Sequence, residues 1–345
     1  MKIVSVEQMR ALEAAAFASG ITETALQARA GRVVAEEALR LVDAGQHTVV
    51  LVGHGNNGRD GAVAAAWLLE HGIRVTLVLT PRHAVTRSEL SQLEHLGARR
   101  VSSDSTADVQ RCLDDAQLVI DALAGIGVRG ALREPLASLV RMLNSHQKRV
   151  LALDIPSGID ADTGQVQGEA VQAAVTVTLG AVKQGLLRFP AAEYVGRLRP
   201  REIGIPAEAS SSLPYAVSRE DELSTLVPAR PLAAHKYRFG RVLVIAGSDH
   251  FLGAPVMCSG GALRAGAGLV TVASTRDVRL NVAAHLPEAT FTAADVSVAD
   301  GPAVLEPYLK SHTVVLGPGL GRSGATTEFV RNILRMRNKE RVLLI

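Results

Sequence analysis

Short apolar runs rich in Val, Ile and Leu alternate along the chain with segments of helical periodicity. The runs that predict strands cover residues 48–52, 73–79, 117–120, 149–153 and 174–179. Apolar residues at helical spacing predict two helices within 5–45 and further helices over 61–71, 86–96, 107–116 and 132–145. The strand runs are continuous rather than alternating, which indicates strands buried on both faces. This order predicts an α/β fold with a doubly wound parallel sheet.

A second strand–helix series follows in the last third of the chain. It predicts strands over 241–246, 268–273, 312–316 and 341–345, with helices from 254 and near 326–336. Residues 196–217 contain three Pro and a Ser run, so we expect them to be a linker. The length of 345 residues also favours two domains, which we place at 1–217 and 218–345. No covering segment follows the last strand, and we expect the second domain to be incomplete.

Composition excludes several functional classes. The longest apolar run, 62–69, is far shorter than a membrane span, and the acidic, helical start at 1–15 does not read as a signal peptide. The net charge is only +3 and the aromatic content is 3%, which argues against a nucleic-acid partner. Cys112 and Cys258 lie far apart without a CxxC pair. A disulfide framework is therefore excluded, and we expect the reducing cytoplasm.

Polar, glycine-rich loops follow three of the predicted strands. They are Gly53–Gly61 (GHGNNGRDG), Asp121–Gly130 and Asp154–Asp160. Ligands bind at the carboxyl ends of parallel strands, so we expect these loops to open on one edge of the sheet. Two of the loops match GxGxxG, which is a weak signal alone. An ordinary NAD dehydrogenase is disfavoured because the next strand ends in Leu79-Thr-Pro-Arg82, with no acid for the ribose.

Each candidate side chain has a structural alternative. Asp60 could cap a helix that begins at Gly61, and Asp121 could hold a neighbouring loop. Asp154 is harder to explain structurally, since a buried strand and a rigid Ile-Pro turn fix it, and this favours a tuned acid or base. Asn57, Asp121 and Ser157 offer hard oxygen ligands that suit an alkali or alkaline-earth cation. Their spacing fits a hydrogen-bond network equally well.

These loops carry a resemblance. GHGNNGRDG, DALAGIG (121–127) and DIPSG (154–158) resemble the three signatures of the YjeF N-terminal family, the NAD(P)H-hydrate epimerases, over residues 1–217. Segments that include 240–248, 262–271 and 317–321 resemble the start of an ADP/ATP-dependent NAD(P)H-hydrate dehydratase, a ribokinase-like domain. Together they resemble the family of bifunctional NAD(P)H-hydrate repair enzymes. The resemblance implies a Rossmann-like first domain, followed by a partial ribokinase-like α/β domain.

The resemblance also implies an activity. The first domain would interconvert the R and S hydrates of NADH and NADPH (NAD(P)HX), and the second would dehydrate the S form with ADP or ATP. The implied substrate-binding residues are Asn56, Asn57, Gly58, Arg59, Asp60, Gly125, Ile126, Gly127, Val128, Arg129, Gly130, Ala131 and Asp154, with Ala254, Gly319 and Gly321 in the second domain. Asp154 and Asp60 are the catalytic candidates, and K⁺ would lie at Asn57, Asp121 and Ser157. Mg²⁺ is a further cofactor candidate.

The sequence departs from the family pattern at two positions. Arg59 stands where the family has Gly, and Ile126 stands where it has Thr. Arg59 would either crowd the loop or pair with a substrate phosphate. The dehydratase's Gly-x-Gly-Asp catalytic motif does not occur in the 345 residues, so we expect no dehydration by this chain alone.

Other functions remain open at this stage. A non-catalytic YjeF-type scaffold keeps the fold, but the three aspartates Asp60, Asp121 and Asp154 argue against it. A ribokinase-class kinase explains only the second half, and an NADP reductase lacks the ribose acid. We also expect a homo-oligomer, since the helical pair in residues 5–45 would be exposed.

Overall fold

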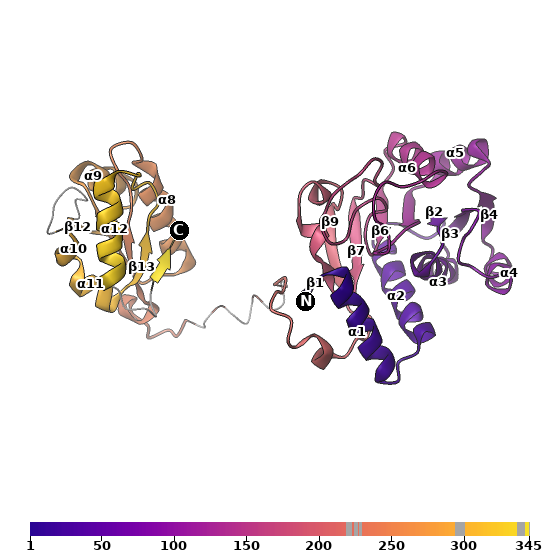
Figure 1. Ribbon diagram of the computed structural model, residues 1–345, viewed down its shortest axis with the longest axis horizontal. Coiled ribbons are helices and arrows are strands. Elements are labelled where there is room, and N and C mark those ends of the chain that lie inside the picture. Colours follow the sequence, from indigo (N-terminus) through magenta and orange to yellow (C-terminus); the bar gives the residue numbers. More distant parts are fainter. Residues whose placement is uncertain (219–222, 224–226, 228–229, 294–300, 337–341, 345) are drawn as a thin grey trace. The chain divides into compact units, whose positions relative to one another are not determined.

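A computed structural model describes residues 1–345 except 219–222, 224–226, 228–229, 294–300, 337–341 and 345 (Figure 1). The chain divides into two compact units, Met1–Leu226 and Val227–Ile345. Each unit has its own parallel sheet, which confirms the predicted α/β class. Among the described residues, none of the helices has the length and apolar character needed to cross a bilayer.

The first unit contains a seven-stranded sheet in the order β4-β3-β2-β5-β6-β7-β9. All six neighbouring pairs run parallel. The strands are Arg99–Ser102 (β4), Arg74–Leu79 (β3), His47–Val52 (β2), Leu118–Ala122 (β5), Val150–Leu153 (β6), Val175–Leu179 (β7) and Arg197–Arg201 (β9). A smaller sheet pairs Ile3–Val4 (β1) with Val182–Lys183 (β8). The strand order of the large sheet reverses between β2 and β5, where a parallel sheet forms a crevice.

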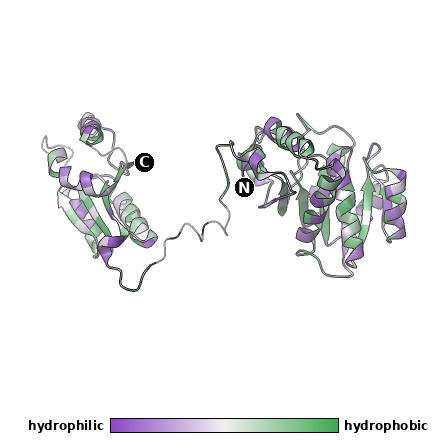
Figure 2. Cartoon of the chain, turned by 90° about the horizontal axis from the view of Figure 1, so that it is seen from below, coloured by the Kyte–Doolittle hydropathy of each residue, from purple (hydrophilic) through white to green (hydrophobic). Residues whose placement is uncertain are grey.

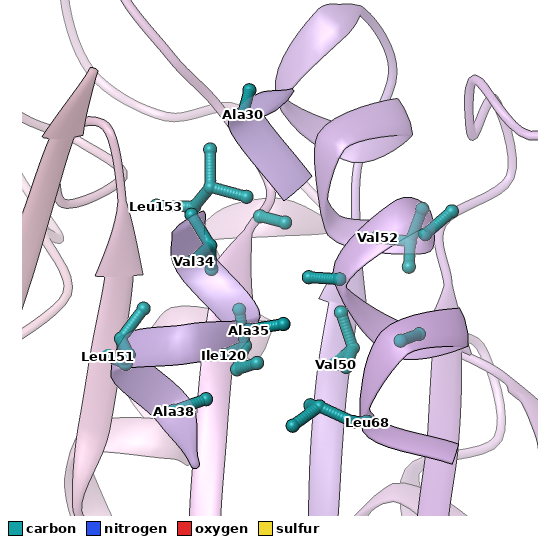
Figure 3. Close-up of a cluster of buried hydrophobic side chains, with 14 of the residues drawn as sticks. Ala30, Val34, Ala35, Ala38, Val50, Val52, Leu68, Ile120, Leu151 and Leu153 are labelled. Atoms are coloured by element: carbon teal, nitrogen blue, oxygen red, sulfur yellow. The ribbon is translucent and has the colours of Figure 1, made fainter. Parts of the chain in front are cut away.

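Helices cover both faces of this sheet (Figure 1). The helices of the first unit are Val6–Ala18 (α1), Glu23–Ala38 (α2), Asn56–Glu70 (α3), Arg87–His95 (α4), Thr106–Asp115 (α5) and Leu136–Ser145 (α6). Side chains alternate along β2, so Val50 and Val52 pack with α2 and α3, as Figure 3 shows. Val49 and Leu51 instead pack in a second cluster with α5 and α6. The doubly wound arrangement predicted from the sequence is therefore confirmed.

The segment predicted as a linker, 196–217, is folded into the first unit. Arg197–Arg201 pairs with β7 as the edge strand of the sheet, where Pro200 is tolerated because an edge strand has unpaired N–H positions. Further on, Lys2 and Ala216 form an antiparallel bridge. The linker prediction is wrong because Pro and Ser content alone does not exclude strand pairing. Strand β4, another edge strand, was not predicted, because its sequence RRVS is polar.

The second unit contains a five-stranded parallel sheet in the order β12-β11-β10-β13-β14. Its strands are Thr290–Ala293 (β12), Leu269–Ser274 (β11), Arg241–Ile245 (β10), Thr313–Leu316 (β13) and Val342–Leu344 (β14). Its helices are Gly253–Ala265 (α8), Arg276–His285 (α9), Gly301–Val304 (α10), Glu306–Ser311 (α11) and Gly324–Met336 (α12). The strands of both units are largely hydrophobic (Figure 2). Residues 341 and 345 of the predicted last strand lie outside the described residues.

Close packing of α2 on α3 generates a stability prediction. A methyl group on Gly31 would lie 2.4 Å from Cβ of Val63 and 2.8 Å from the carbonyl oxygen of Asp60. Helix propensity favours Ala over Gly by about 1 kcal/mol, but overpacking costs about 1–3 kcal/mol and forces the helices apart. We therefore expect Gly31→Ala to lower the free energy of unfolding. Urea unfolding followed by fluorescence of Trp67, the only tryptophan, measures it.

Gly127→Ala is the matched control in the same unit, because nothing lies within 4 Å of its added methyl group. Its unfolding midpoint should stay close to that of the parent protein. An unchanged midpoint for Gly31→Ala would contradict the tight α2–α3 contact.

Candidate functional site

A cavity of about 510 Å³ opens beside the point where the strand order of the first unit reverses. The loops after β2 and β5, the residue after β6 and the end of β7 contribute to its wall, together with α1, α2 and α3. Eight of the predicted substrate-binding residues line it: Asn56, Asn57, Asp60, Gly125, Ile126, Gly127, Val128 and Asp154. Gly58, Arg59, Arg129, Gly130 and Ala131 are absent from the lining described for it. The structure thus brings residues from both predicted loops into the wall of one cavity.

The first loop is shorter than the sequence analysis predicts. Helix α3 begins at Asn56, directly after Gly55, and not at Gly61. Asp60 therefore lies in the second turn of the helix, and the alternative that it caps the helix is wrong. Gly53 makes this tight entry possible, because a methyl group there would lie 1.7 Å from the carbonyl oxygen of Leu123.

Arg59 points away from the first cavity. Its Nε donates a hydrogen bond to the carbonyl oxygen of Ala84 at 3.4 Å, and its side chain lines a separate cavity between α3 and α4. Arg59 therefore neither crowds the entry loop nor reaches the cavity that holds Asp60. Ile126 does line the first cavity, where it also packs against buried apolar residues.

Asp154 follows β6 in an uncommon backbone conformation, with φ of +66°. Its Oδ1 accepts hydrogen bonds from the backbone N–H of Leu179 at 3.0 Å and the hydroxyl of Thr178 at 3.4 Å, and it forms an ion pair with Lys183. Lys183 is 1% exposed, and its ammonium also donates to the carbonyl oxygen of Leu179 at 2.7 Å. Asp154 is thus fixed in place as the partner of a buried cation.

Asp60 lies in a different electrostatic environment in the same cavity. It is 8% exposed, and its Oδ1 has no hydrogen-bond partner among the described residues. Burial raises the pKa of Asp60 well above its ordinary value, and the negative charges of Asp154, Glu13 and Glu23 raise it further. Burial also raises the pKa of Glu13. The cavity therefore favours the protonated form of Asp60.

Asn57, Asp121 and Ser157, the predicted cation ligands, meet around the backbone of Ala124. The Asn57 amide donates to the carbonyl oxygen of Ala124 at 3.1 Å, and the Ser157 hydroxyl oxygen accepts from the backbone N–H of Ala124 at 3.0 Å. The Asp121 carboxylate accepts from the Ser157 hydroxyl at 2.7 Å and from its backbone N–H at 2.8 Å. Asp121 is fully buried, and burial raises its pKa to about 6 despite these bonds.

The side chains of this cluster could bind a cation only through oxygen atoms. Among the described residues there is no group of three or more His, Cys, Asp or Glu side chains that could hold a metal ion. No cationic side chain is recorded as a partner of Asp121 within the described part of the chain. A buried carboxylate without a cation, next to hydroxyl, amide and carbonyl oxygens, fits a bound alkali cation.

Several side chains of the cavity were not predicted from the sequence. Lys183, Glu13, Glu23 and Arg10 all line it. The signal for Lys183 was its place at the end of the apolar stretch VTVTLGAV, where a charged side chain needs a partner. Glu13 and Glu23 gave no such signal, because acidic residues on helices are ordinarily solvated. His54 lines the cavity as well.

The candidate residues of the second unit also lie near a reversal of strand order, between β10 and β13. A methyl group on Gly319 would lie 3.1 Å from Cβ of Ala254, so these two positions are neighbours. The Ser248 hydroxyl donates to the carbonyl oxygen of Gly319 at 2.8 Å and joins the two loops. Gly321 has a φ of +83° and nothing within 4 Å of an added methyl group.

Two protein families match the chain, one in each unit. Residues 23–185 match the family described as YjeF-related protein N-terminus, and residues 242–344 match the family described as NAD(P)H-hydrate dehydratase. A Coxiella burnetii protein named bifunctional NAD(P)H-hydrate repair enzyme is 36% identical over 95% of this chain and 66% of its own length. A protein of the same name from Pyrobaculum aerophilum is 34% identical over 94% and 66%.

The fold of the first unit has a solved counterpart. The crystal structure of the yeast protein ynu0 superposes with a TM-score of 0.54 at 23% identity, over 64% of this chain and 98% of the yeast chain. The present chain spans about two thirds of the length of the curated relatives named above. With both parts matched in the same order, the chain belongs to the family that joins a YjeF-related N-terminal domain to an NAD(P)H-hydrate dehydratase domain.

Proposed function

We propose that the first unit is an epimerase of hydrated NADH and NADPH. The observation that carries this proposal is the cavity at the strand-order reversal, which holds two buried carboxyl groups in contrasting environments, Asp154 and Asp60. The substrate class is taken from the names of the relatives. Domain bounds of 1–217 and 218–345 remain the proposed division of activities.

Epimerisation of these hydrates requires proton transfer at one defined ring carbon. In these hydrates a hydroxyl is attached to the ring carbon beside the nitrogen, and inversion there needs loss and return of that hydroxyl or opening of the ring. Positioned carboxyl groups such as Asp154 and Asp60 serve such proton transfers. The N-terminus of α3 at Asn56 and the loop from Gly125 to Val128 would hold the pyrophosphate.

We further propose that Asn57, Asp121 and Ser157 hold a K⁺ ion. The support is the buried Asp121 carboxylate, whose hydrogen bonds leave its charge without a cation among the described residues. A bound K⁺ would neutralise that charge and stabilise the two loops that meet at Ala124. The ion sits behind the cavity wall in this proposal, since Asp121 and Ser157 are not among the described lining residues.

For the second unit we propose a place for the dehydratase substrate at Ala254, Gly319 and Gly321, with ADP or ATP and Mg²⁺ as the cofactors of that reaction. The match of 242–344 to the dehydratase family supports this assignment. The homo-oligomeric state and the cytoplasmic location remain predictions from the sequence.

Interconversion of the pure S and R hydrates, followed by chromatography that resolves them, tests the epimerase proposal. We expect Asp154→Asn and Asp60→Asn each to slow interconversion by about 100-fold or more, because each removes a group that holds or moves a proton. Asp104→Asn is the matched control, since Asp104 is an exposed aspartate outside the cavity. Tight binding of the hydrates by the parent protein without interconversion would instead favour the scaffold alternative.

Thermal melts with and without potassium test the cation proposal. The native pKa of Asp121 is about 6, above the ordinary value of about 4. The native state therefore binds more protons than the unfolded state between about pH 4 and pH 6, and stability falls as pH rises through that window. Because K⁺ binds the ionised carboxylate, KCl should raise the melting temperature more at about pH 7.5 than at about pH 5.

Choline chloride at the same ionic strength controls for screening in these melts. Asp121→Asn should lose the potassium-specific shift at both pH values. A shift of equal size with choline, or one retained by Asp121→Asn, would rule out the proposed site.

A third measurement concerns dehydration. Incubation of this 345-residue chain with the S hydrate and ADP or ATP should give no nucleotide-dependent recovery of NADH absorbance. The reason is that the catalytic Gly-x-Gly-Asp motif does not occur in the sequence. Recovery that depends on nucleotide would show that another residue takes over this chemistry.

A further inference from the structure

Lys183 is the largest fully buried side chain of the described residues, yet it carries a charge. It lies on β8, a strand of two residues that pairs with β1. Burying an ammonium is costly unless it is paired and hydrogen-bonded. Here it donates to the carbonyl oxygen of Leu179, 2.7 Å away, and to the carboxylate of Asp154. The fold therefore keeps a cation in the wall of the cavity, directly beside a candidate catalytic group.

The ion pair is one-sided. Every hydrogen bond recorded for the Asp154 carboxylate within the described residues goes to Oδ1, from Lys183, Leu179 and Thr178. None goes to Oδ2, and Asp154 lines the cavity. An acceptor oxygen is thus left for a ligand while the other oxygen fixes the orientation of the group.

The other charged and titratable groups of the cavity do not provide such a partner for Asp154. They are Arg10 and Glu13 from α1, Glu23 from α2, Asp60 from α3 and His54 from the loop before α3. Most of these groups are acidic, so without Lys183 the carboxylate of Asp154 would face further negative charge. Among the described residues, no ion pair and no hydrogen bond to Oδ1 is recorded for Asp60.

We propose that Lys183 is a positioning residue that holds the Asp154 carboxylate with Oδ2 turned to the cavity. Asp60 then donates a proton to the departing hydroxyl as its bond to the ring carbon breaks, and Asp154 accepts a proton from the water that forms the new carbon–oxygen bond. Proton exchange with solvent restores both groups. The inference rests on the proposed epimerase function and assigns the two carboxyl groups their separate roles. Two carboxyl groups in one cavity with contrasting partners are the usual basis of such a division. Lys183 has a positioning role in this proposal, because its ammonium is held by Asp154 and Leu179.

The test compares Lys183→Met, which keeps the length of the side chain and removes the charge, with Lys183→Arg, which keeps the charge. We expect Lys183→Met to lower kcat for epimerisation by about tenfold on the acid limb of the pH profile, with little change in KM. Its rate should recover at higher pH, so that the acid limb of the pH profile moves up by about one unit or more. Lys183→Arg should keep the parent pH profile even where its rate falls.

A merely structural lysine gives a different pattern. Loss of rate that is uniform across pH, or a rise in KM with an unchanged profile, would overturn the proposal. In an Asp154→Asn background, Lys183→Met should cause no further loss if Lys183 acts only through Asp154. Additive losses would contradict the inference.

A second readout does not depend on turnover. Carbon-13 NMR of carboxyl-labelled aspartate, with the Asp154 signal assigned by its loss in Asp154→Asn, follows the titration of this group directly. We expect the titration to move to higher pH in Lys183→Met and to stay near the parent position in Lys183→Arg. An unmoved titration overturns the role of Lys183, whereas a moved titration without any epimerisation by the parent protein would refute only the proposed function.

Discussion

Every strand of the large sheet runs in the same direction, and this constraint determines where polar groups gather. Parallel strands need helical crossovers, so each loop that follows a strand opens on the same edge. Apolar side chains pack on both faces of the sheet, so the polar groups gather at that edge. The reversal of strand order between β2 and β5 then separates two neighbouring loops and leaves room for the cavity.

At that edge three aspartates are buried, and each has different hydrogen-bond and charge partners. Asp154 has a buried ammonium, Asp121 has hydrogen bonds from Ser157, and Asp60 has an unpartnered oxygen. A cation and hydrogen-bond donors favour the ionised form, whereas burial without partners favours the protonated form. Residues of one type thus acquire different chemistry from their surroundings alone. These different surroundings support the proposed cation beside Asp121 and the proposed role of Asp60 as a proton donor.

The strand runs of the sequence predicted the central sheet well, because buried parallel strands are continuous apolar segments. The two edge strands were not predicted. β4 is polar and β9 contains Pro200, because an edge strand pairs with only one neighbour and needs no continuous apolar sequence. Loop positions predicted which residues approach the cavity, but the start of α3 at Asn56 changed which way they point, and Arg59 faces another cavity. The apolar stretch before Lys183 indicated a charge in need of a partner, but that partner could not be identified, because Asp154 lies 29 residues away in the sequence.

The segment that resembles a linker in composition instead supports the site. The backbone N–H of Ile3 donates to the carbonyl oxygen of Tyr215 at 3.0 Å, and Ile3 pairs with Val182 on the other side. The first residues of the chain therefore lie between residues 215–217 and the short strand that carries Lys183. A two-residue strand has little stability alone, so the position of the buried ammonium depends on contacts from both ends of the first unit. A change that destabilises the N-terminal strand would therefore also disturb the ion pair between Lys183 and Asp154.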